Sequence, residues 1–173
     1  MNVLVTGAAG LIGSHTTDLL LQNGHMVDGI DDLSYGTLDN LSYAIKNKNF
    51  KFIHDKVENI KNYKTKYDII YHFASLKKAW DGSELSADIL DTNYHMTKIL
   101  VQRCLQHKTK FIFASTSDIY GNSKTFCEDD NITMGAATNI RYSYALSKWH
   151  SEQYILNTFQ QQGLECTVIR IFG

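Results

Sequence analysis

The amino-acid sequence predicts an α/β protein, with a parallel sheet of about six strands and helices on both faces, folded as one domain. Three observations predict this fold. Apolar runs of strand length recur along the chain, helical stretches separate them, and the 173 residues are 43% hydrophobic and 12% aromatic. A chain of this size and composition can form a substantial core. Strands that alternate with helices form a parallel sheet covered on both faces.

Six apolar runs have the length and composition of buried strands. They are Asn2–Thr6, Met26–Asp31, Phe50–His54, Asp68–His72, Lys110–Ser115 and Cys166–Phe172. The runs are nearly continuous rather than alternating in polarity, which is typical of strands in a parallel sheet buried on both faces. Six such strands would complete a doubly wound, dinucleotide-binding sheet of the Rossmann type.

Three segments are predicted to be helices. The first spans about Leu11–Gln22 and precedes an Asn-Gly pair, which favours a helix end. Longer helices are expected at about Ser86–Gln106 and Tyr142–Gln161, whereas Asn122–Asn139 lacks clear periodicity and is expected to be a loop. We therefore expect one dinucleotide-binding domain over residues 1–173.

Composition and charge argue against several classes of function. The 17 Lys and Arg residues against 18 Asp and Glu residues give a net charge of −1 without a basic stripe, so nucleic acid is not an expected partner. Cys104, Cys127 and Cys166 are isolated, as expected in a reducing compartment, and neither they nor the seven scattered histidines have metal-ligand spacing. Without a signal peptide or an apolar run of about 20 residues, we expect a cytoplasmic protein that does not bind membranes.

A glycine-rich segment joins the first predicted strand to the first helix. Residues 6–13 read TGAAGLIG and place Gly7, Gly10 and Gly13 where a backbone can turn sharply and approach a pyrophosphate at a helix N-terminus. The second strand ends in Asp31 and Asp32, and a carboxylate there favours NAD over NADP because it accepts ribose hydroxyls and repels a 2′-phosphate. The alternative is that the glycines serve only a tight turn and that Asp31 caps a helix.

A second group of polar side chains follows the fifth predicted strand. Residues 113–121 read FASTSDIYG, so hydroxyl groups and the Asp118 carboxylate follow a buried apolar run. Such a strand either ends at solvent or presents a site, and Asp118 either caps the turn or acts on a substrate. Tyr144 and Lys148 are four residues apart and share one face of a helix, as a catalytic pair or as an ordinary amphipathic pair.

Together these motifs resemble the extended short-chain dehydrogenase/reductase family, and within it the nucleotide-sugar epimerases and dehydratases of the UDP-galactose 4-epimerase type. The resemblance rests on VTGAAGLIGSH at 5–15, Asp31, DIIYHFAS at 68–75, Asn93, FASTSDIYG at 113–121 and YALSK at 144–148. It covers essentially the whole chain. The ordered set is specific for the family and much less specific for the substrate.

The resemblance implies NAD as the cofactor and a UDP-, GDP- or dTDP-sugar as the substrate. The positions implied for cofactor binding are Gly7, Gly10, Leu11, Ile12, Gly13, Asp31, Asp32, Asp55, Lys56, Phe73, Ala74, Ser75, Lys77, Asn93, Ala114, Tyr144 and Lys148. Among them, Asp55 would contact the adenine edge and Lys77 would lie near the cofactor phosphate. Asn93 would help to order the site.

The resemblance also implies a hydroxyl–tyrosine–lysine catalytic set formed by Thr116, Tyr144 and Lys148. A free tyrosine has a pKa of about 10, and a neighbouring ammonium and the nicotinamide charge would both lower it. Tyr144 would take the proton of the sugar 4-hydroxyl while the C4 hydride passes to NAD+. Thr116 would stabilise the developing oxyanion. The expected reaction is 4-epimerisation through a 4-keto intermediate.

Other reactions remain open. Dehydratases and decarboxylases of the family generally carry glutamate at the position of Asp118, so a 4,6-dehydratase or decarboxylase that uses Asp118 is an alternative. Family members also continue into a C-terminal substrate-binding domain, which this chain is expected to lack. An NAD-binding module without turnover is therefore a further alternative.

The two long helices carry more apolar residues than one contact with a sheet requires. These residues are Leu90, Tyr94, Leu100, Val101 and Leu105 on one helix and Trp149, Ile155, Leu156 and Phe159 on the other. Because family members pair these helices at a dimer interface, we expect a homodimer. The alternative is that all of these residues belong to the core.

Overall fold

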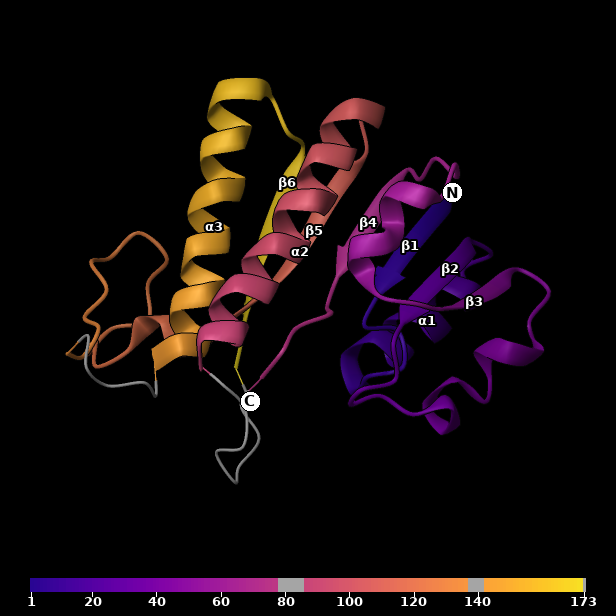
Figure 1. Ribbon diagram of the computed structural model, residues 1–173, viewed down its shortest axis with the longest axis horizontal. Helices are drawn as coiled ribbons and strands as arrows, with labels where there is room; N and C mark the ends of the chain where they lie inside the picture. Colours follow the sequence, from indigo (N-terminus) through magenta and orange to yellow (C-terminus); the bar gives the residue numbers. More distant parts are fainter. Residues whose placement is uncertain (78–85, 137–141, 173) are drawn as a thin grey trace.

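The computed structural model describes residues 1–77, 86–136 and 142–172, which form one parallel sheet flanked by helices (Figure 1). The strands are β1 (Asn2–Thr6), β2 (Met26–Asp31), β3 (Phe50–His54), β4 (Ile69–His72), β5 (Lys110–Thr116) and β6 (Cys166–Ile171). They are ordered β3-β2-β1-β4-β5-β6, and every neighbouring pair is parallel. The predicted Rossmann-type sheet is confirmed.

The observed strand ends differ from the predicted ends by one residue in β4, β5 and β6. β4 begins at Ile69 because Asp68 instead closes the start of β1, where its carboxylate accepts the N–H of Asn2 at 2.7 Å. β5 extends to Thr116, which is in register with Ile171 at the end of β6. These ends depend on hydrogen bonds between strands that are distant in sequence.

All three predicted helices are present, as α1 (Leu11–Gln22), α2 (Ser86–His107) and α3 (Ser143–Gln162). The described residues also contain short 3-10 helices that were not predicted, namely η1 (Leu38–Leu41), η2 (Ala44–Lys46), η3 (Val57–Asn62) and η4 (Ser117–Tyr120). The predicted loop is observed over residues 122–136, with one isolated bridge between Gly121 and Thr133. Residues 137–139 of that loop lie outside the described residues.

The helices cover opposite faces of the sheet, α2 and α3 in front and α1 behind in the view of Figure 1. Successive residues of a strand point to opposite faces. Leu4 therefore packs in a core with Leu100 of α2 and Ile155 of α3, whereas the next residue, Val5, packs in a second core with Leu21 of α1. The sheet is thus buried between two apolar layers.

The carboxyl ends of the six strands lie at the lower edge in Figure 1, where the chain also ends. β1 and β4 are neighbours although they are not consecutive, so the strand order reverses between them. Ligands of doubly wound sheets bind outside the carboxyl ends of the strands at such a switch point. The segments that follow β1, β2, β4 and β5 therefore meet where a ligand is expected.

Several predicted absences can be compared with the part of the chain that the structure describes. Cys104, Cys127 and Cys166 are all free thiols. Within the described ranges, no group of three or more His, Cys, Asp or Glu side chains could hold a metal ion. Among the helices of these ranges, none is both long enough and apolar enough to cross a membrane.

Candidate active site

The turn after β1 requires glycine at Gly7. Its φ is +70°, and a β-carbon there would lie 2.7 Å from the peptide nitrogen of Ala74, just beyond β4. A β-carbon at Gly13 would overlap the carbonyl oxygen of Gly7. Both glycines permit close backbone approach, which brings the start of α1 against the switch point of the sheet.

The N-terminus of α1 is available to an anion. Its N-cap residue, Gly10, provides no side-chain cap, and the first turn contains no acidic residue. Leu11 is 72% exposed and Ile12 is also exposed, so neither side chain is buried over the helix start. Peptide N–H groups without intrahelical partners, together with the positive end of the helix dipole, favour a phosphate at this position.

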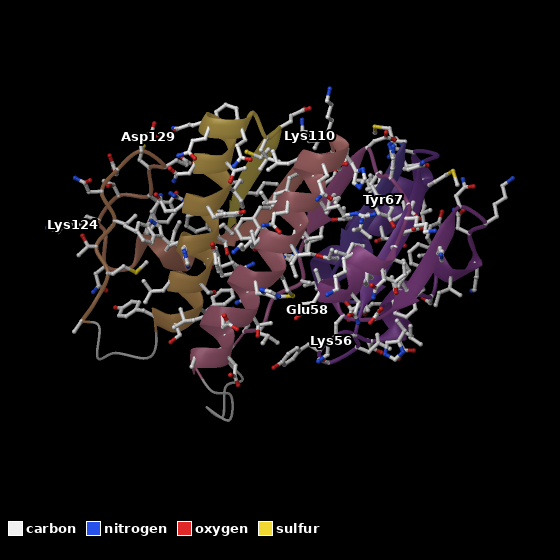
Figure 2. The ribbon with its side chains drawn as sticks, turned by 45° about the horizontal axis from the view of Figure 1, so that its top comes forward. Lys56, Glu58, Tyr67, Lys110, Lys124 and Asp129 are labelled. Carbon is white, nitrogen blue, oxygen red and sulfur yellow. The ribbon has the colours of Figure 1, made fainter. Side chains whose placement is uncertain are left out.

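A cavity of about 380 Å³ adjoins this loop at the carboxyl edge of the sheet. The predicted cofactor residues that line it are Gly7, Gly10, Asp31, Asp32, Asp55, Lys56, Phe73, Ala74 and Ser75. Figure 2 shows Lys56 and Glu58, which also lines the cavity, on the lower side of the molecule in the segment that follows β3. The cavity therefore extends from the glycine turn across β2 and β3.

Part of the cavity wall was not predicted. Ser34, Tyr35 and Gly36 line it from the segment after β2, and Thr92 lines it from α2. A β-carbon at Gly36 would lie 2.7 Å from the β-carbon of Ala9, so this segment packs closely on the glycine-rich loop. The Ser-Tyr-Gly run, one residue after the acidic pair, is a turn signal that could have indicated this wall.

Asp31 joins the end of β2 to the glycine-rich loop. Its carboxylate accepts the N–H of Ala9 at 2.9 Å and the N–H of Leu33 at 2.9 Å. Each carboxylate oxygen has a second acceptor site, so both can still accept a ribose hydroxyl from the cavity side. Asp31 thus has a structural role in addition to the predicted ligand role. The carboxylate of Asp32 accepts the N–H of Ser34 on its own turn, at 3.0 Å.

Asp55 is held on the far wall of the cavity by its neighbours. Its carboxylate accepts hydrogen bonds from Asn59 Nδ2 at 2.6 Å, Tyr63 Oη at 2.7 Å and the N–H of Lys56 at 2.8 Å. The bonds from Asn59 and then Tyr63 lower the pKa of Asp55. Arg103 of α2 steadies the same segment by donating to the carbonyl oxygen of Tyr63 at 2.8 Å.

Tyr144 lies at the start of α3, beside the cavity wall. Burial raises the pKa of its phenol, a hydrogen bond with the Ser75 side chain lowers it, and the nearby Asp118 carboxylate raises it. Two ammonium groups flank the ring, with the Nζ of Lys77 at 5.6 Å and that of Lys148 at 5.9 Å from the ring centroid. Ser75 lines the cavity but Tyr144 does not, so the phenol of Tyr144 is connected to the cavity wall through its hydrogen bond with Ser75.

Lys148 is buried below Tyr144 and is only 2% exposed. Its Nζ donates to the carbonyl oxygen of Ala114 at 2.8 Å and lies 4.7 Å from the centroid of the Phe113 ring. Burial lowers the pKa of Lys148 to about 7, and the charge of Glu152 opposes this shift. The surroundings of Lys148 therefore disfavour its charged form, because burial removes the water that would solvate the ammonium.

Asn93 connects the segment after β4 to α3. Its Oδ1 accepts the N–H of Leu76 at 2.8 Å, and its Nδ2 donates to the carbonyl of Leu76 at 2.9 Å and to the Oγ of Ser147 at 3.0 Å. Ser147 in turn donates to the carbonyl of Tyr144 at 2.7 Å. One buried amide therefore orients both segments that carry the predicted catalytic set.

Thr116 caps the short helix η4 that follows β5. Its Oγ1 accepts the N–H of Asp118 at 3.1 Å and can still donate its own proton. The Asp118 side chain is exposed, and its carboxylate makes no hydrogen bond or ion pair with the described residues. The N–H of Gly121 bonds instead to the main-chain carbonyl of Asp118. The alternative in which the Asp118 carboxylate caps this turn is therefore wrong.

Three polar side chains near the site, two buried and one partly buried, were missed. His72 forms a 2.8 Å hydrogen bond with Thr6, and burial, followed by the charge of Lys148, lowers the pKa of the imidazole. Glu152, which is buried, forms an ion pair with the partly buried Arg170. The signals for this pair were weak: a glutamate four residues after the lysine, and one arginine within an apolar strand.

These residues fit a dinucleotide cofactor. The uncapped helix start fits the pyrophosphate, the Asp31 carboxylate fits a ribose diol, and the cavity continues beyond both toward Asp55. Leu11, Ile12 and Gly13 do not line the cavity, so only their peptide groups could serve the cofactor. Lys77, Asn93, Ala114, Tyr144 and Lys148, which were also predicted to bind the cofactor, do not line the cavity.

The chain matches the model of the NAD dependent epimerase/dehydratase family over residues 3–173. A curated relative, the UDP-N-acetyl-alpha-D-glucosaminuronate decarboxylase of Bacillus cytotoxicus, is 33% identical over 98% of this chain and 53% of its own length. UDP-glucuronic acid decarboxylase 1 of Danio rerio is 31% identical over 99% of this chain and 41% of its own length. The chain thus spans about half the length of the curated relatives it matches.

A solved structure shows the same fold with NAD bound. It is UDP-glucuronic acid 4-epimerase from Bacillus cereus in complex with NAD, with a TM-score of 0.84 and 28% identity over 98% of this chain and 55% of that chain. The cofactor predicted from the sequence is thereby confirmed as NAD.

Proposed function

Because the chain belongs to the NAD-dependent epimerase/dehydratase family, we propose that it oxidises C4 of a nucleotide sugar to a ketone, with Tyr144 as the base. One observation carries this proposal. The phenol of Tyr144 reaches the cavity wall through Ser75, while the ammonium groups of Lys77 and Lys148 flank the same ring. A tyrosine acts as a base at neutral pH only where positive charge favours its phenolate.

Bound NAD+ supplies the hydride acceptor. Tyr144 takes the proton of the sugar 4-hydroxyl, and Lys148 stabilises the phenolate on which this step depends. The hydroxyl of Thr116 keeps a proton to donate, so it can stabilise the negative charge that develops on the sugar oxygen. Asn93 maintains the geometry by fixing α3 to the segment that carries Ser75.

We infer 4-epimerisation as the outcome, because it needs only hydride removal, a turn of the keto-sugar and hydride return. Solved relatives with this activity by name support the inference. Decarboxylation or dehydration is the second candidate, and Asp118 favours it. Its carboxylate is exposed, engaged in no hydrogen bond or ion pair with the described residues, and close enough to raise the pKa of Tyr144.

A UDP-sugar is the proposed substrate class, since the named relatives act on UDP-sugars. The test incubates the NAD-loaded protein with UDP-, GDP- and dTDP-sugars and records NADH absorbance, the C4 epimer, released carbon dioxide and the dehydrated sugar. The C4 epimer of a UDP-sugar is expected, and carbon dioxide or a dehydrated sugar would favour the second candidate. If NAD binds tightly but none of the sugars gives reduced cofactor or any product, the proposal is overturned and the chain is an NAD-binding module.

We further propose that two copies of the chain pair through α2 and α3. Ile155 belongs to the core, but Leu90, Trp149, Leu156 and Phe159 are between 37% and 54% exposed on these helices. Large apolar side chains gathered on one surface are typical of a protein interface. Sedimentation should give a dimer, and Trp149→Lys should shift it toward monomer, whereas a monomeric wild type would contradict the pairing.

A further inference from the structure

The catalytic half of the sheet contains a buried ion pair that the reaction described above does not use. Arg170 of β6 donates to both carboxylate oxygens of Glu152 in α3, with Nη2 at 2.9 Å from Oε2 and Nε at 3.2 Å from Oε1. The Glu152 side chain is 2% exposed and that of Arg170 is 14% exposed. The Glu152 carboxylate is thus buried and the Arg170 guanidinium largely so, and each depends on the other for compensation of its lost hydration.

The pair is located where it can act on the catalytic lysine. Glu152 follows Lys148 by four residues, so the two side chains share one face of α3, and both are buried. The charge of Glu152 acts on Lys148 and favours its protonated form. Among the described residues, the ammonium makes one hydrogen bond, which it donates to the neutral carbonyl oxygen of Ala114.

The same arginine also contacts the segment that carries Thr116. Its guanidinium carbon lies 4.9 Å from the centroid of the Tyr120 ring, and Tyr120 ends η4, which Thr116 caps. Arg170 therefore touches Glu152 on α3 and Tyr120 on η4. These are the two elements whose relative position fixes the catalytic set.

We propose that Glu152, clamped by Arg170, is a positioning residue that keeps the Lys148 ammonium charged beneath Tyr144. This rests on the proposed function, in which Lys148 stabilises the phenolate. Without Glu152 the buried ammonium would release its proton at a lower pH than it does in the wild type, and Tyr144 would lose that stabilisation. Without Arg170 the buried carboxylate would lose its ion-pair partner and the bidentate contact that fixes its position.

Other titratable groups around Lys148 do not replace Glu152. His72 is buried on the sheet side, and its lowered pKa keeps it neutral. Tyr144 is neutral until the reaction needs its phenolate, since burial raises its pKa. Lys77 adds positive charge near the Tyr144 ring, with its Nζ at 5.6 Å from the ring centroid, and Asp118 is exposed.

The test measures the protonation of Lys148 in the free protein, by NMR titration of its Cε methylene in isotope-labelled lysine, assigned with Lys148→Arg. Wild type should titrate near the pKa of about 7 that burial gives Lys148. Glu152→Gln should lower the midpoint by about one pH unit or more, because the opposing charge is lost. An unchanged midpoint would overturn the proposal.

Glu165→Gln is the matched control. It also removes a glutamate from an ion pair, with Lys110 at 3.2 Å, but that glutamate side chain is 71% exposed and lies at the opposite end of β6. Its titration curve for Lys148 should overlay that of wild type. A shift in this control equal to that of Glu152→Gln would mean that net charge, rather than position, is responsible.

If Glu152→Gln does not fold, the same titration of Lys148 is made in the double variant Glu152→Gln, Arg170→Met. It leaves no unpaired charge between α3 and β6, so it should fold, and it still deprives Lys148 of its carboxylate. The midpoint should again fall below that of wild type, and an unchanged midpoint would overturn the proposal. Because no substrate or cofactor is present, this result is independent of whether the proposed reaction occurs.

Discussion

The two halves of the sheet differ in where their charged side chains lie, at a cavity in one half and buried in the other. Around β1, β2 and β3, the carboxylates of Asp31, Asp32 and Asp55 lie at a cavity and bind neutral donors, which are peptide N–H groups, an amide and a phenol. Around β5, β6 and α3, the charges of Lys148 and Glu152 are buried.

In the first half the charged groups face a ligand cavity, whereas in the second half they stabilise one another inside the protein. Charges that face a cavity stay hydrated until a ligand arrives, so each can be changed with little effect on folding. Buried charges are stable only as a set, because each compensates the desolvation of another. Substitutions of charged residues around β1, β2 and β3 should therefore change mainly ligand binding. Substitutions around β5, β6 and α3 should change mainly stability and the protonation of the buried groups.

The largest effect should come from removing the base. Tyr144→Phe should lower the rate of hydride transfer by about a thousandfold, since the 4-hydroxyl then has no positioned proton acceptor. The phenol lies beside Ser75 rather than near Asp31, so NAD affinity should stay within about threefold of wild type. Single-turnover kinetics and an NAD titration test both parts, and unchanged turnover would contradict the assignment.

The second effect compares the two ion pairs of β6 and its flank. Glu152→Gln should reduce the free energy of unfolding by about 3–5 kcal/mol, because it strands the buried Arg170. Glu165→Gln should reduce it by less than about 1 kcal/mol, because its partner Lys110 is exposed to water. Urea denaturation measures both losses of unfolding free energy. Equal losses would contradict the claim that the charge of Glu152 depends on burial and pairing in a way that an exposed charge does not.

The third effect concerns the glycine turn of the cofactor half. Gly7→Ala should destabilise the fold by about 2–3 kcal/mol and abolish NAD binding, because its β-carbon meets the backbone of Ala74. Gly24→Ala is the matched control, since its φ of +78° is similar but no atom lies within 4 Å of its β-carbon. It should lose only about 1 kcal/mol, by thermal unfolding, and should bind NAD normally.

The fourth effect is a pH dependence of stability. Lys148 titrates at about 7 when folded against 10.5 ordinarily, so between these values the unfolded chain binds a proton that the folded chain lacks. Stability should therefore rise with pH in this window. Lys148→Met should remove the rise and stabilise the protein below pH 7 by about 2 kcal/mol. Urea midpoints between about pH 7 and 9 measure it, and parallel curves for the two proteins would contradict it.

The smallest effect on folding should follow Asp31→Asn. The amide oxygen can still accept the N–H of Ala9, but the amide nitrogen cannot accept that of Leu33, so one hydrogen bond is lost and stability should fall by about 1 kcal/mol. Binding should change more, with NAD affinity about tenfold lower and the preference over NADP reduced, because the ribose loses a charged acceptor. Competition titrations with both cofactors measure this, and an unaltered preference would contradict the ligand role.

Sequence patterns predicted the features that depend on neighbours along the chain. The apolar runs predicted the six strands, the glycine spacing predicted the turn at Gly7, and the four-residue spacing placed Tyr144 and Lys148 on one helix face. Contacts between distant residues gave no such pattern. The pairing of Arg170 with Glu152 joins residues 18 positions apart, and the bond from Lys148 to Ala114 joins residues 34 apart.

Where a residue has two possible roles, the sequence also could not show which role it takes. Asp118 could cap a turn or face a substrate, and only the structure shows that Thr116 provides the cap. Asp31 was predicted as a ligand, and its second role in holding Ala9 depends on how two loops meet. The strand ends likewise depend on partners such as Asn2 for Asp68.

The most direct test of the central claim follows the hydrogen on C4. The NAD-loaded protein is mixed with a UDP-sugar that carries deuterium at C4, and the mass of the cofactor is measured in a single turnover. Deuterium should appear in the reduced cofactor of wild type and not in that of Tyr144→Phe. A cofactor that stays free of deuterium while the sugar is converted would contradict oxidation at C4, and with it the role given to Tyr144 and its buried charges.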